Sequence, residues 1–326
     1  MAPELNRIWL AVCLLAPVAA SAAGCPAPAC FTRPVEIVVP FAAGGPVDTV
    51  ARIIAAPLAA LVGQQVVVNN RAGAGGAIGG KVVVDAAPDS HTILVTNSVS
   101  VVAAPSLYSR FPFNPLKDLV PVIQVGSTPH VLAVRSDAPW KNLKEFVAAA
   151  DSGSKPINYG SAGPGSFSHL LGEQLKLAGA RRLLHIPYKG AGPAFTDFLQ
   201  GQFDAMFVDA AMAAKEVKSG RLRFLAITGD RRSPGFPEVP TFNEQGVVGM
   251  ESAWIGVFYP AKTHPNIVLR LSSETQKLLG DPKVREKLEA AGVVAGGLEG
   301  EAFARAMASQ SSMWQGVIQK AGVKAE

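Results

Sequence analysis

Short apolar runs alternate along most of this chain with stretches whose apolar positions recur at helical spacing. The runs predict strands at Val35–Pro40, Gln65–Asn69, Thr92–Thr96, Val122–Val125, Val131–Arg135, Ile157–Tyr159, Leu183–Ile186, Ala205–Val208, Arg223–Thr228 and Ala253–Tyr259. The helical spacing predicts helices at Thr49–Leu61, Ile78–Ala86, Leu143–Ala149, Phe167–Leu177, Pro193–Leu199, Ala211–Lys218, Ile267–Leu279, Val284–Ala290 and Phe303–Ala321. Strands that alternate with helices are typical of α/β proteins with largely parallel sheets. Pro57 falls inside the first predicted helix and should kink or split it.

One arrangement occurs twice: an apolar strand, a glycine-rich turn and the start of a helix. The first turn is Ala42–Asp48 and the second is Ser161–Gly165. Glycine lets the backbone turn sharply and approach a ligand, and the first turn of a helix points free N–H groups and its positive dipole end outward. Each copy is therefore a candidate anion site that needs no basic side chain. Two such sites in two lobes would grip one small acidic molecule from both sides.

The length of the chain favours two domains. It has 326 residues, which is more than a single hydrophobic core usually supports. Hydrophobic residues make up 48% and charged residues 17%, as in an ordinary globular protein with a sparsely charged surface. Lys and Arg occur in no run longer than pairs such as Arg181-Arg182, so a nucleic-acid partner is not expected. The net charge of +5 would help to attract an anionic ligand.

Residues 1–24 have the features of a secretory signal peptide. Arg7 precedes the apolar stretch Ile8–Ala20, which is too short to span a bilayer, and Ala20-Ser21-Ala22 offers a cleavage site. We therefore expect an exported protein. Cys25 and Cys30 would remain after cleavage, either as a small disulfide loop or as thiols, or with a lipid anchor on Cys25. Ala22 stands where a lipoprotein signal usually has Leu, which favours the first alternatives.

Motifs for nucleotides, catalysis and metals are incomplete. Gly75–Lys81 fits the spacing of a phosphate loop, but Val82 stands where that loop needs Ser or Thr, and Ile78 replaces the third glycine of the dinucleotide fingerprint. Neither Ser161 nor Ser166 lies in a G-x-S-x-G elbow. The histidines, at positions 91, 130, 169, 185 and 264, show no metal-ligand spacing. We therefore expect no cofactor, no metal and no catalytic residue.

Five polar residues at the ends of predicted elements have two interpretations each. Asp48 precedes the first predicted helix, where capping the helix is favoured over contacting a ligand. For His169, one turn into a helix, a hydrogen bond that holds the preceding turn is favoured over catalysis. Asp209 follows a strand at the edge where α/β sheets bind ligands, so a ligand contact and a bond to a neighbouring loop are equally favoured. Asn97 and Ser98 follow another strand at the same kind of edge, and for them a polar contact with the ligand is favoured about as much as a purely structural role.

Taken in order, many segments resemble the substrate-binding receptors of tripartite tricarboxylate transporters, the Bug-type or TctC-like periplasmic proteins. The similar segments are Arg33–Gly45, Val66–Gly76, Ala87–Asp89, Tyr159–Gly163 with His169, His185–Gly190, Gly201–Asp204, Val239–Thr241 and the helical tail around Trp314. The resemblance implies a two-lobed periplasmic-binding-protein fold of type II, in which each lobe is a mostly parallel sheet flanked by helices. Residues 33–125 and 252–326 would form one lobe, and residues 126–251 the other.

The resemblance also implies a receptor rather than an enzyme. It would capture a small carboxylate in the periplasm, as a monomer, and deliver it to permease subunits in the membrane. Its ligand would be a di- or tricarboxylate, an acidic amino acid or an aromatic carboxylate. The site residues that the resemblance implies are Phe41, Ala42, Gly44, Gly45, Asp48, Asn97, Ser98, Ser161, Ala162, Gly163, Ser166 and Asp209. The two turns would hold a carboxylate through backbone amides, partly through ordered water, and Asn97, Ser98 and Asp209 would line the specificity side.

The chain departs from the family pattern in places. Val47 replaces the small polar residue usual before the aspartate, which leaves the identity of the ligand open, and Ser90-His91 stands where Gly-Tyr is common. The Cys25–Cys30 leader is also unusual. A receptor that feeds a signalling partner is one alternative function. An exported α/β enzyme that acts on small acids is another, and the missing nucleophile, metal set and cofactor fingerprint count against it.

Overall fold

The computed structural model describes residues 31–325. The predicted signal peptide, Cys25 and Cys30 lie outside the described residues.

The elements alternate as the sequence pattern predicts. The strands are β1 (Val35–Val39), β2 (Val66–Asn70), β3 (Thr92–Asn97), β4 (Leu119–Thr128), β5 (His130–Arg135), β6 (Ile157–Ser161), β7 (Leu183–Pro187), β8 (Ala205–Asp209), β9 (Leu222–Ile227), β10 (Ala253–Pro260) and β11 (Val294–Ala295). The helices are α1 (Pro46–Val62), α2 (Ala77–Val84), α3 (Ala104–Leu107), α4 (Pro115–Asp118), α5 (Leu143–Ser152), α6 (Phe167–Leu177), α7 (Ala191–Leu199), α8 (Ala210–Lys218), α9 (Pro265–Gly280), α10 (Pro282–Ala290) and α11 (Gly300–Ala321). Each predicted strand and helix corresponds to one of these, while α3, α4 and β11 are too short to produce a readable pattern.

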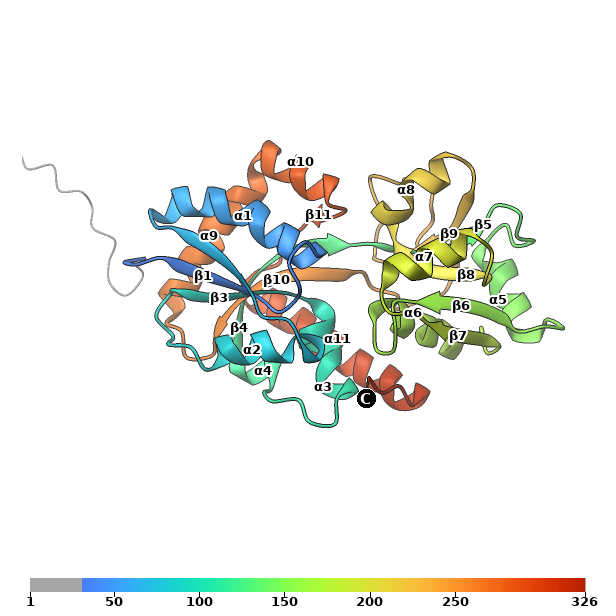
Figure 1. Cartoon of the computed structure of the whole chain (residues 1–326), viewed down its shortest axis with the longest axis horizontal. Helices are drawn as coiled ribbons and strands as arrows, with labels where there is room; N and C mark the ends of the chain where they lie inside the picture. The colour runs from blue at the N-terminus through green and yellow to red at the C-terminus, as the bar shows by residue number, and fades with distance from the viewer. Residues whose placement is uncertain (1–30, 326) are drawn as a thin grey trace, which may run out of the picture.

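The strands form two sheets, each flanked by helices (Figure 1). Within residues 31–325, one sheet has the order β11-β4-β10-β3-β1-β2 and the other the order β7-β6-β8-β5-β9. We call the parts built on them lobe 1 and lobe 2. The chain passes from lobe 1 to lobe 2 at Pro129, between β4 and β5, and returns between β9 and β10. The predicted α/β class with two lobes is confirmed.

Most strands of each sheet run in one direction. In lobe 1, β1 is parallel to β2 and β3, and β4 shares their direction because it is antiparallel to β10, which is antiparallel to β3. In lobe 2, β6 is parallel to β7 and β8, and β5 is antiparallel to β8 and β9. The short strand β11 is reversed, since it is antiparallel to β4. Strands β5 and β10 also run against the parallel strands and follow the two crossings, because a chain that arrives from the other lobe enters the sheet at the edge where the parallel strands end. As a result, β1 runs toward lobe 2 and β6 runs toward lobe 1 (Figure 1).

Helix α1 starts earlier than its apolar pattern suggests. It begins at Pro46, which suits the first helical position because proline lacks the N–H that would be unpaired there, and it ends at Gly63 in the left-handed conformation. Of the two predicted effects of Pro57, a kink or a split, the split is wrong, since one helix runs from Pro46 to Val62. Its buried residues pack on the lobe 1 sheet, so tertiary contacts outweigh the hydrogen bond that Pro57 cannot make.

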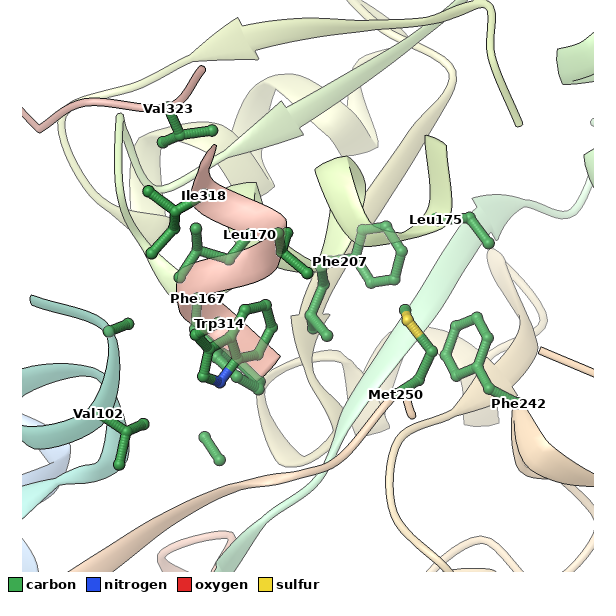
Figure 2. Packing of buried hydrophobic residues seen from close by; sticks show 14 of the residues in the cluster. Val102, Phe167, Leu170, Leu175, Phe207, Phe242, Met250, Trp314, Ile318 and Val323 are labelled. Carbon is green, nitrogen blue, oxygen red and sulfur yellow. The ribbon is translucent and has the colours of Figure 1, made fainter. Parts of the chain in front are cut away.

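The C-terminal helix α11 packs against both lobes. The ring of Trp314 meets the ring of Phe167 in lobe 2 edge-on, with centroids 5.7 Å apart (Figure 2). On the lobe 1 side, Gln310 accepts a hydrogen bond from the Trp254 indole N–H at 2.7 Å. One continuous hydrophobic cluster therefore runs from residues such as Val102 in lobe 1, through Trp314, into lobe 2. Among the helices of residues 31–325, none is both long and apolar enough to cross a membrane.

Gly172 in α6 is required by close packing, and this gives the first prediction. A Cβ at position 172 would lie 2.2 Å from the ring of Tyr159, which is fully buried. Gly172→Ala is therefore expected to lower the free energy of unfolding by about 1–3 kcal/mol through overpacking. Gly316→Ala in α11, where a Cβ meets nothing within 4 Å, should instead be neutral or stabilising by up to about 1 kcal/mol. Urea denaturation compares the two variants, and an equal effect of both would contradict the packing argument.

Candidate functional site

The predicted site residues follow strands whose carboxyl ends face the other lobe. The turn that contains Ala42–Gly45 follows β1, and Asn97-Ser98 ends and follows the parallel strand β3. In lobe 2, the turn Ala162–Ser166 follows β6, and Asp209 ends the parallel strand β8. Ligands of open α/β sheets bind at this edge, outside the carboxyl ends of the strands. The topology thus brings the predicted groups of each lobe to the edge that faces the other.

The turn after β1, which we call the first loop (Pro40–Gly45), presents free backbone donors. Gly44 is in the left-handed region, with φ of +82°, and its N–H donates to Oδ2 of Asp48 at 2.8 Å. The N–H groups of Ala42 and Ala43 have no hydrogen-bond partner among residues 31–325, and both residues are exposed. The first loop can therefore offer two adjacent N–H groups to an anion.

Asp48 fastens the first loop from behind. It is the third residue of α1 and its side chain is buried, so the prediction that it caps the helix is wrong; the helix already begins at Pro46. Its carboxylate accepts hydrogen bonds from the Gly44 N–H, from Arg52 Nε at 2.9 Å and from Asn70 Nδ2 at 2.9 Å. The hydrogen bond from Arg52, followed by those from Gly44 and Asn70, lowers the pKa of Asp48 to about 2 against the cost of burial.

Asn70 and Arg52 complete this support and were not predicted from the sequence. Asn70 ends β2 and donates to the carbonyl of Phe41 at 3.0 Å as well as to Asp48. Arg52 Nη2 donates to Asn70 Oδ1 at 3.3 Å. Arg52 lies four residues after Asp48, and this spacing in a helix predicts an ion pair between the two side chains. Asn70 could be recognised only after β2 had been placed beside β1.

The turn after β6, which we call the second loop (Ala162–Ser166), uses its own backbone donors internally. Pro164 has no N–H, and the other four N–H groups of the loop all donate within the protein. Ala162 donates to Ser168 Oγ at 3.1 Å and Gly163 to Ser161 Oγ at 3.0 Å. Gly165 donates to His169 Nδ1 at 3.0 Å and Ser166 to the Gly163 carbonyl at 3.1 Å. The expectation that these amides hold a carboxylate therefore does not fit this conformation. The N–H groups of Phe167 and Ser168, in the first turn of α6, have no partner among the described residues.

Two histidines lie directly behind the second loop. His169 and His185 stack with ring centroids 3.8 Å apart and planes 9° from parallel. The Nε2 atom of His185 is 2.6 Å from Ser161 Oγ, and His169 Nδ1 accepts from Gly165. The predicted role of His169, a hydrogen bond that holds the turn, is confirmed. Burial lowers the pKa of both imidazoles, that of His185 to about 4, and the neighbouring His169 lowers the pKa of His185 further.

The Ser161–His185 pair has the composition of a catalytic dyad but not its accessibility. Ser161 is fully buried, and its Oγ also accepts the Gly163 N–H. A nucleophile must be able to reach the substrate, and this hydroxyl is enclosed beneath the loop. The pair therefore serves the shape of the second loop. His185 is far from Ser161 in sequence, so no local signal could have linked them.

The other predicted side chains make structural hydrogen bonds. Ser98 Oγ is buried and accepts the Trp254 N–H at 3.4 Å, and Asn97 Oδ1 accepts the Ser100 N–H at 3.1 Å. Ser166 Oγ caps α6, and Asp209 Oδ1 caps α8 by accepting from Ala211 and Met212. Within residues 31–325, the hydrogen bonds of these two side chains use Asn97 Oδ1 and Asp209 Oδ1, and none is made by Asn97 Nδ2 or Asp209 Oδ2. These two atoms remain as polar groups at the facing edges.

The lobes also touch beside the loops. Gly292, between α10 and β11, lies against the start of α8, since a Cβ there would be 2.7 Å from Ala211 Cβ. Gly165 of the second loop lies close to Leu107 of lobe 1 and to Ala325. No group of three His, Cys, Asp or Glu side chains within residues 31–325 is arranged to hold a metal ion.

Comparison with known proteins gives a consistent result. Residues 50–323 match the family model described as tripartite tricarboxylate transporter family receptor. A TctC solute-binding protein from Polaromonas, solved without ligand, is 31% identical with a TM-score of 0.81, and the match covers 89% of this chain and 99% of that one. MatC from Rhodopseudomonas palustris, solved with malate, is 33% identical with a TM-score of 0.72 over 88% of this chain and 99% of its own. Another R. palustris protein, solved with adipate, is 29% identical with a TM-score of 0.75 over 90% of this chain and 98% of its own.

The support of the first loop by Asp48 gives the second prediction. The folded pKa of Asp48 is about 2 against an ordinary value of 3.8, so its stabilisation is complete above that ordinary value and is lost as the pH falls toward 2. Asp48→Asn should lower the free energy of unfolding at pH 7 by about 1–2 kcal/mol, because Arg52 is half exposed and part of the pairing energy is screened. The difference from wild type should shrink between pH 4 and pH 2.

Asp85→Asn is the matched control, since Asp85 forms an exposed helical pair with Lys81. Its effect on stability should be no more than about 0.5 kcal/mol. Urea denaturation at several pH values measures both variants. Equal losses in the two would show that Asp48 is not a special anchor.

Proposed function

Because this chain belongs to the receptor family of tripartite tricarboxylate transporters, we propose that it captures a small dicarboxylate outside the cytoplasm and delivers it to the membrane subunits of such a transporter. A solute-binding role is common to this family, and its fold is that of non-enzymatic receptors. The ligand class, the membrane partner and the periplasmic location are parts of the proposal.

The observation that carries the proposal is the placement of two helix-starting loops on facing edges of two lobes. The first loop offers the N–H groups of Ala42 and Ala43, and the start of α6 offers those of Phe167 and Ser168. Adjacent backbone N–H groups in a turn, like those in the first turn of a helix, bind carboxylates without a basic side chain. One such group of donors on each lobe matches a ligand with a carboxylate at each end. Malate and adipate, which are bound to two of the related proteins, have this form.

The proposal includes a closing motion of the lobes. We assign residues 33–128 and 252–326 to lobe 1 and residues 129–251 to lobe 2, which moves the predicted boundary at 125/126 by three residues because β4 pairs with β10 as far as Thr128, and we place the hinges near Pro129 and near Ser252. A ligand held by the first loop and by the start of α6 would favour the arrangement in which these two segments are closest. Asn97 and Asp209, each with one polar atom left over, would contact the part of the ligand between its carboxylates.

The direct test is binding by purified protein freed of ligand. We expect malate, adipate or another dicarboxylate in a panel of organic acids to raise thermal stability, by about 2.7 kcal/mol at 100 times its dissociation constant. The matching diamides should have no effect, because they lack the charge. Small-angle scattering should show a smaller radius of gyration with the bound acid. Turnover of the acid, or stabilisation by none of the panel, would overturn the proposal.

The shape of the first loop gives the third prediction. Gly44→Ala should weaken binding of the best dicarboxylate about tenfold, because an alanine at φ of +82° is strained and the strain would be relieved by moving the loop that carries the Ala42 and Ala43 donors. The control is Gly63→Ala at the other end of α1, where φ is +71° and a Cβ also meets nothing within 4 Å.

Both substitutions should cost about 1 kcal/mol of stability. Only Gly44→Ala should change the affinity, which isothermal titration calorimetry measures. If both variants bind as wild type does, the first loop does not contact the ligand.

A further inference from the structure

The stacked histidines behind the second loop are connected to both of its ends. His185 contacts Ser161, the residue that leads into the loop, and His169 binds Gly165 near its exit. We propose that this pair positions the second loop and, with it, the start of α6 that carries the Phe167 and Ser168 N–H groups, and that protonation of His169 releases the loop, so that ligand capture weakens in acid. The inference rests on the proposed function, because it assigns ligand contact to this part of the molecule.

The hydrogen bond at His169 requires an unprotonated nitrogen. Nδ1 accepts the Gly165 N–H at 3.0 Å, so the proton of the neutral ring lies on Nε2, which faces Glu173 Oε1 at 3.7 Å. A protonated ring would carry N–H on both nitrogens. Two N–H groups would then oppose each other at Gly165 and the hydrogen bond would be lost. Gly165 has φ of +72°, and without this bond the loop loses a contact that holds it in that conformation.

His185 transmits the same constraint to the other end of the loop. Its Nε2 atom contacts the hydroxyl of Ser161, which in turn accepts the Gly163 N–H. The two rings are face to face at 3.8 Å, so a charge on one disfavours a charge on the other. Displacement of the His169 ring would therefore disturb the contacts at Ser161 as well as the one at Gly165.

Some of the groups around the two histidines favour a charged His169 and others oppose it. From α6, Glu173 favours a charge on His169, while Lys176 opposes it and is itself bonded to Glu173 Oε2 at 2.9 Å. From β6, the Tyr159 hydroxyl donates to Glu173 Oε1 at 2.9 Å and so reduces the attraction that this carboxylate exerts on His169. Burial is the largest influence and favours the neutral ring, which lowers the pKa of His169. The loop is therefore set at neutral pH and is released only on acidification.

The decisive variants separate the hydrogen bond from the ring. His169→Asn keeps an acceptor close to the position of Nδ1 but does not titrate. His169→Phe keeps the ring and removes the acceptor. His264→Asn is the matched control, because the Nδ1 atom of His264 also accepts a backbone N–H, from Asn266 at 3.2 Å, at the exposed start of α9.

Affinity for malate and for adipate is measured by calorimetry between pH 8 and pH 5. Between these two pH values, we expect the affinity of wild type to fall by a factor about ten times larger than the factor for His169→Asn, because one hydrogen bond is lost only in wild type. The titration of the acids themselves is common to both proteins. His264→Asn should follow wild type, and His169→Phe should bind about tenfold more weakly at pH 8 with unchanged circular dichroism. Coincident pH profiles for wild type and His169→Asn would overturn the inference.

Amide hydrogen exchange without ligand tests the release of the loop by itself. Peptides that cover residues 161–166 should exchange faster in wild type than in His169→Asn at pH 5, and equally at pH 8. Equal exchange at both pH values would overturn the inference. If wild type binds no dicarboxylate, the proposed function fails, and this exchange comparison still decides whether His169 controls the loop.

Discussion

Parallel pairing of β1 with β2 and β3, and of β6 with β7 and β8, is the constraint on which the rest of this structure depends. Parallel neighbours end at the same edge of a sheet, so all loops that follow them gather there. Strands β5 and β10, which follow the crossings, run antiparallel to their neighbours. The carboxyl ends of the parallel strands in each lobe therefore point toward the other lobe. Neither loop could form a shared site without this orientation, whatever its own sequence.

The two loops that face each other are stabilised by different chemistry. The first loop is fastened by an ionised carboxylate, Asp48, which is held between a backbone N–H, a guanidinium and an amide. The second loop is fastened by neutral imidazoles and a buried hydroxyl. A carboxylate keeps its hydrogen bonds down to low pH, whereas an imidazole acceptor is lost as soon as the ring is protonated. The two halves of the proposed site should therefore respond differently to acid.

Helix α11 would constrain the proposed closure of the lobes. It joins the core of lobe 1 through the Gln310–Trp254 bond and meets lobe 2 through the Trp314–Phe167 contact. Gln310 also donates to Glu251, close to the second crossing of the chain. Closing the lobes must either preserve these contacts or replace them with others of similar energy. A rotation about an axis near α11 preserves most of them, because displacements are smallest close to the axis.

The sequence by itself determined the order of strands and helices, the α/β class and the two strand–turn–helix units, because these follow from apolar periodicity and from glycine in tight turns. Its resemblance to a receptor family correctly indicated the family. Only the tertiary structure decided which atoms remain free to bind. Asp48, Ser98 and Ser166 are occupied by partners, and the amides of the second loop are already used. Those partners, such as Asn70, Trp254 and His185, come from other strands, and no local pattern specifies which strand will lie beside a given loop.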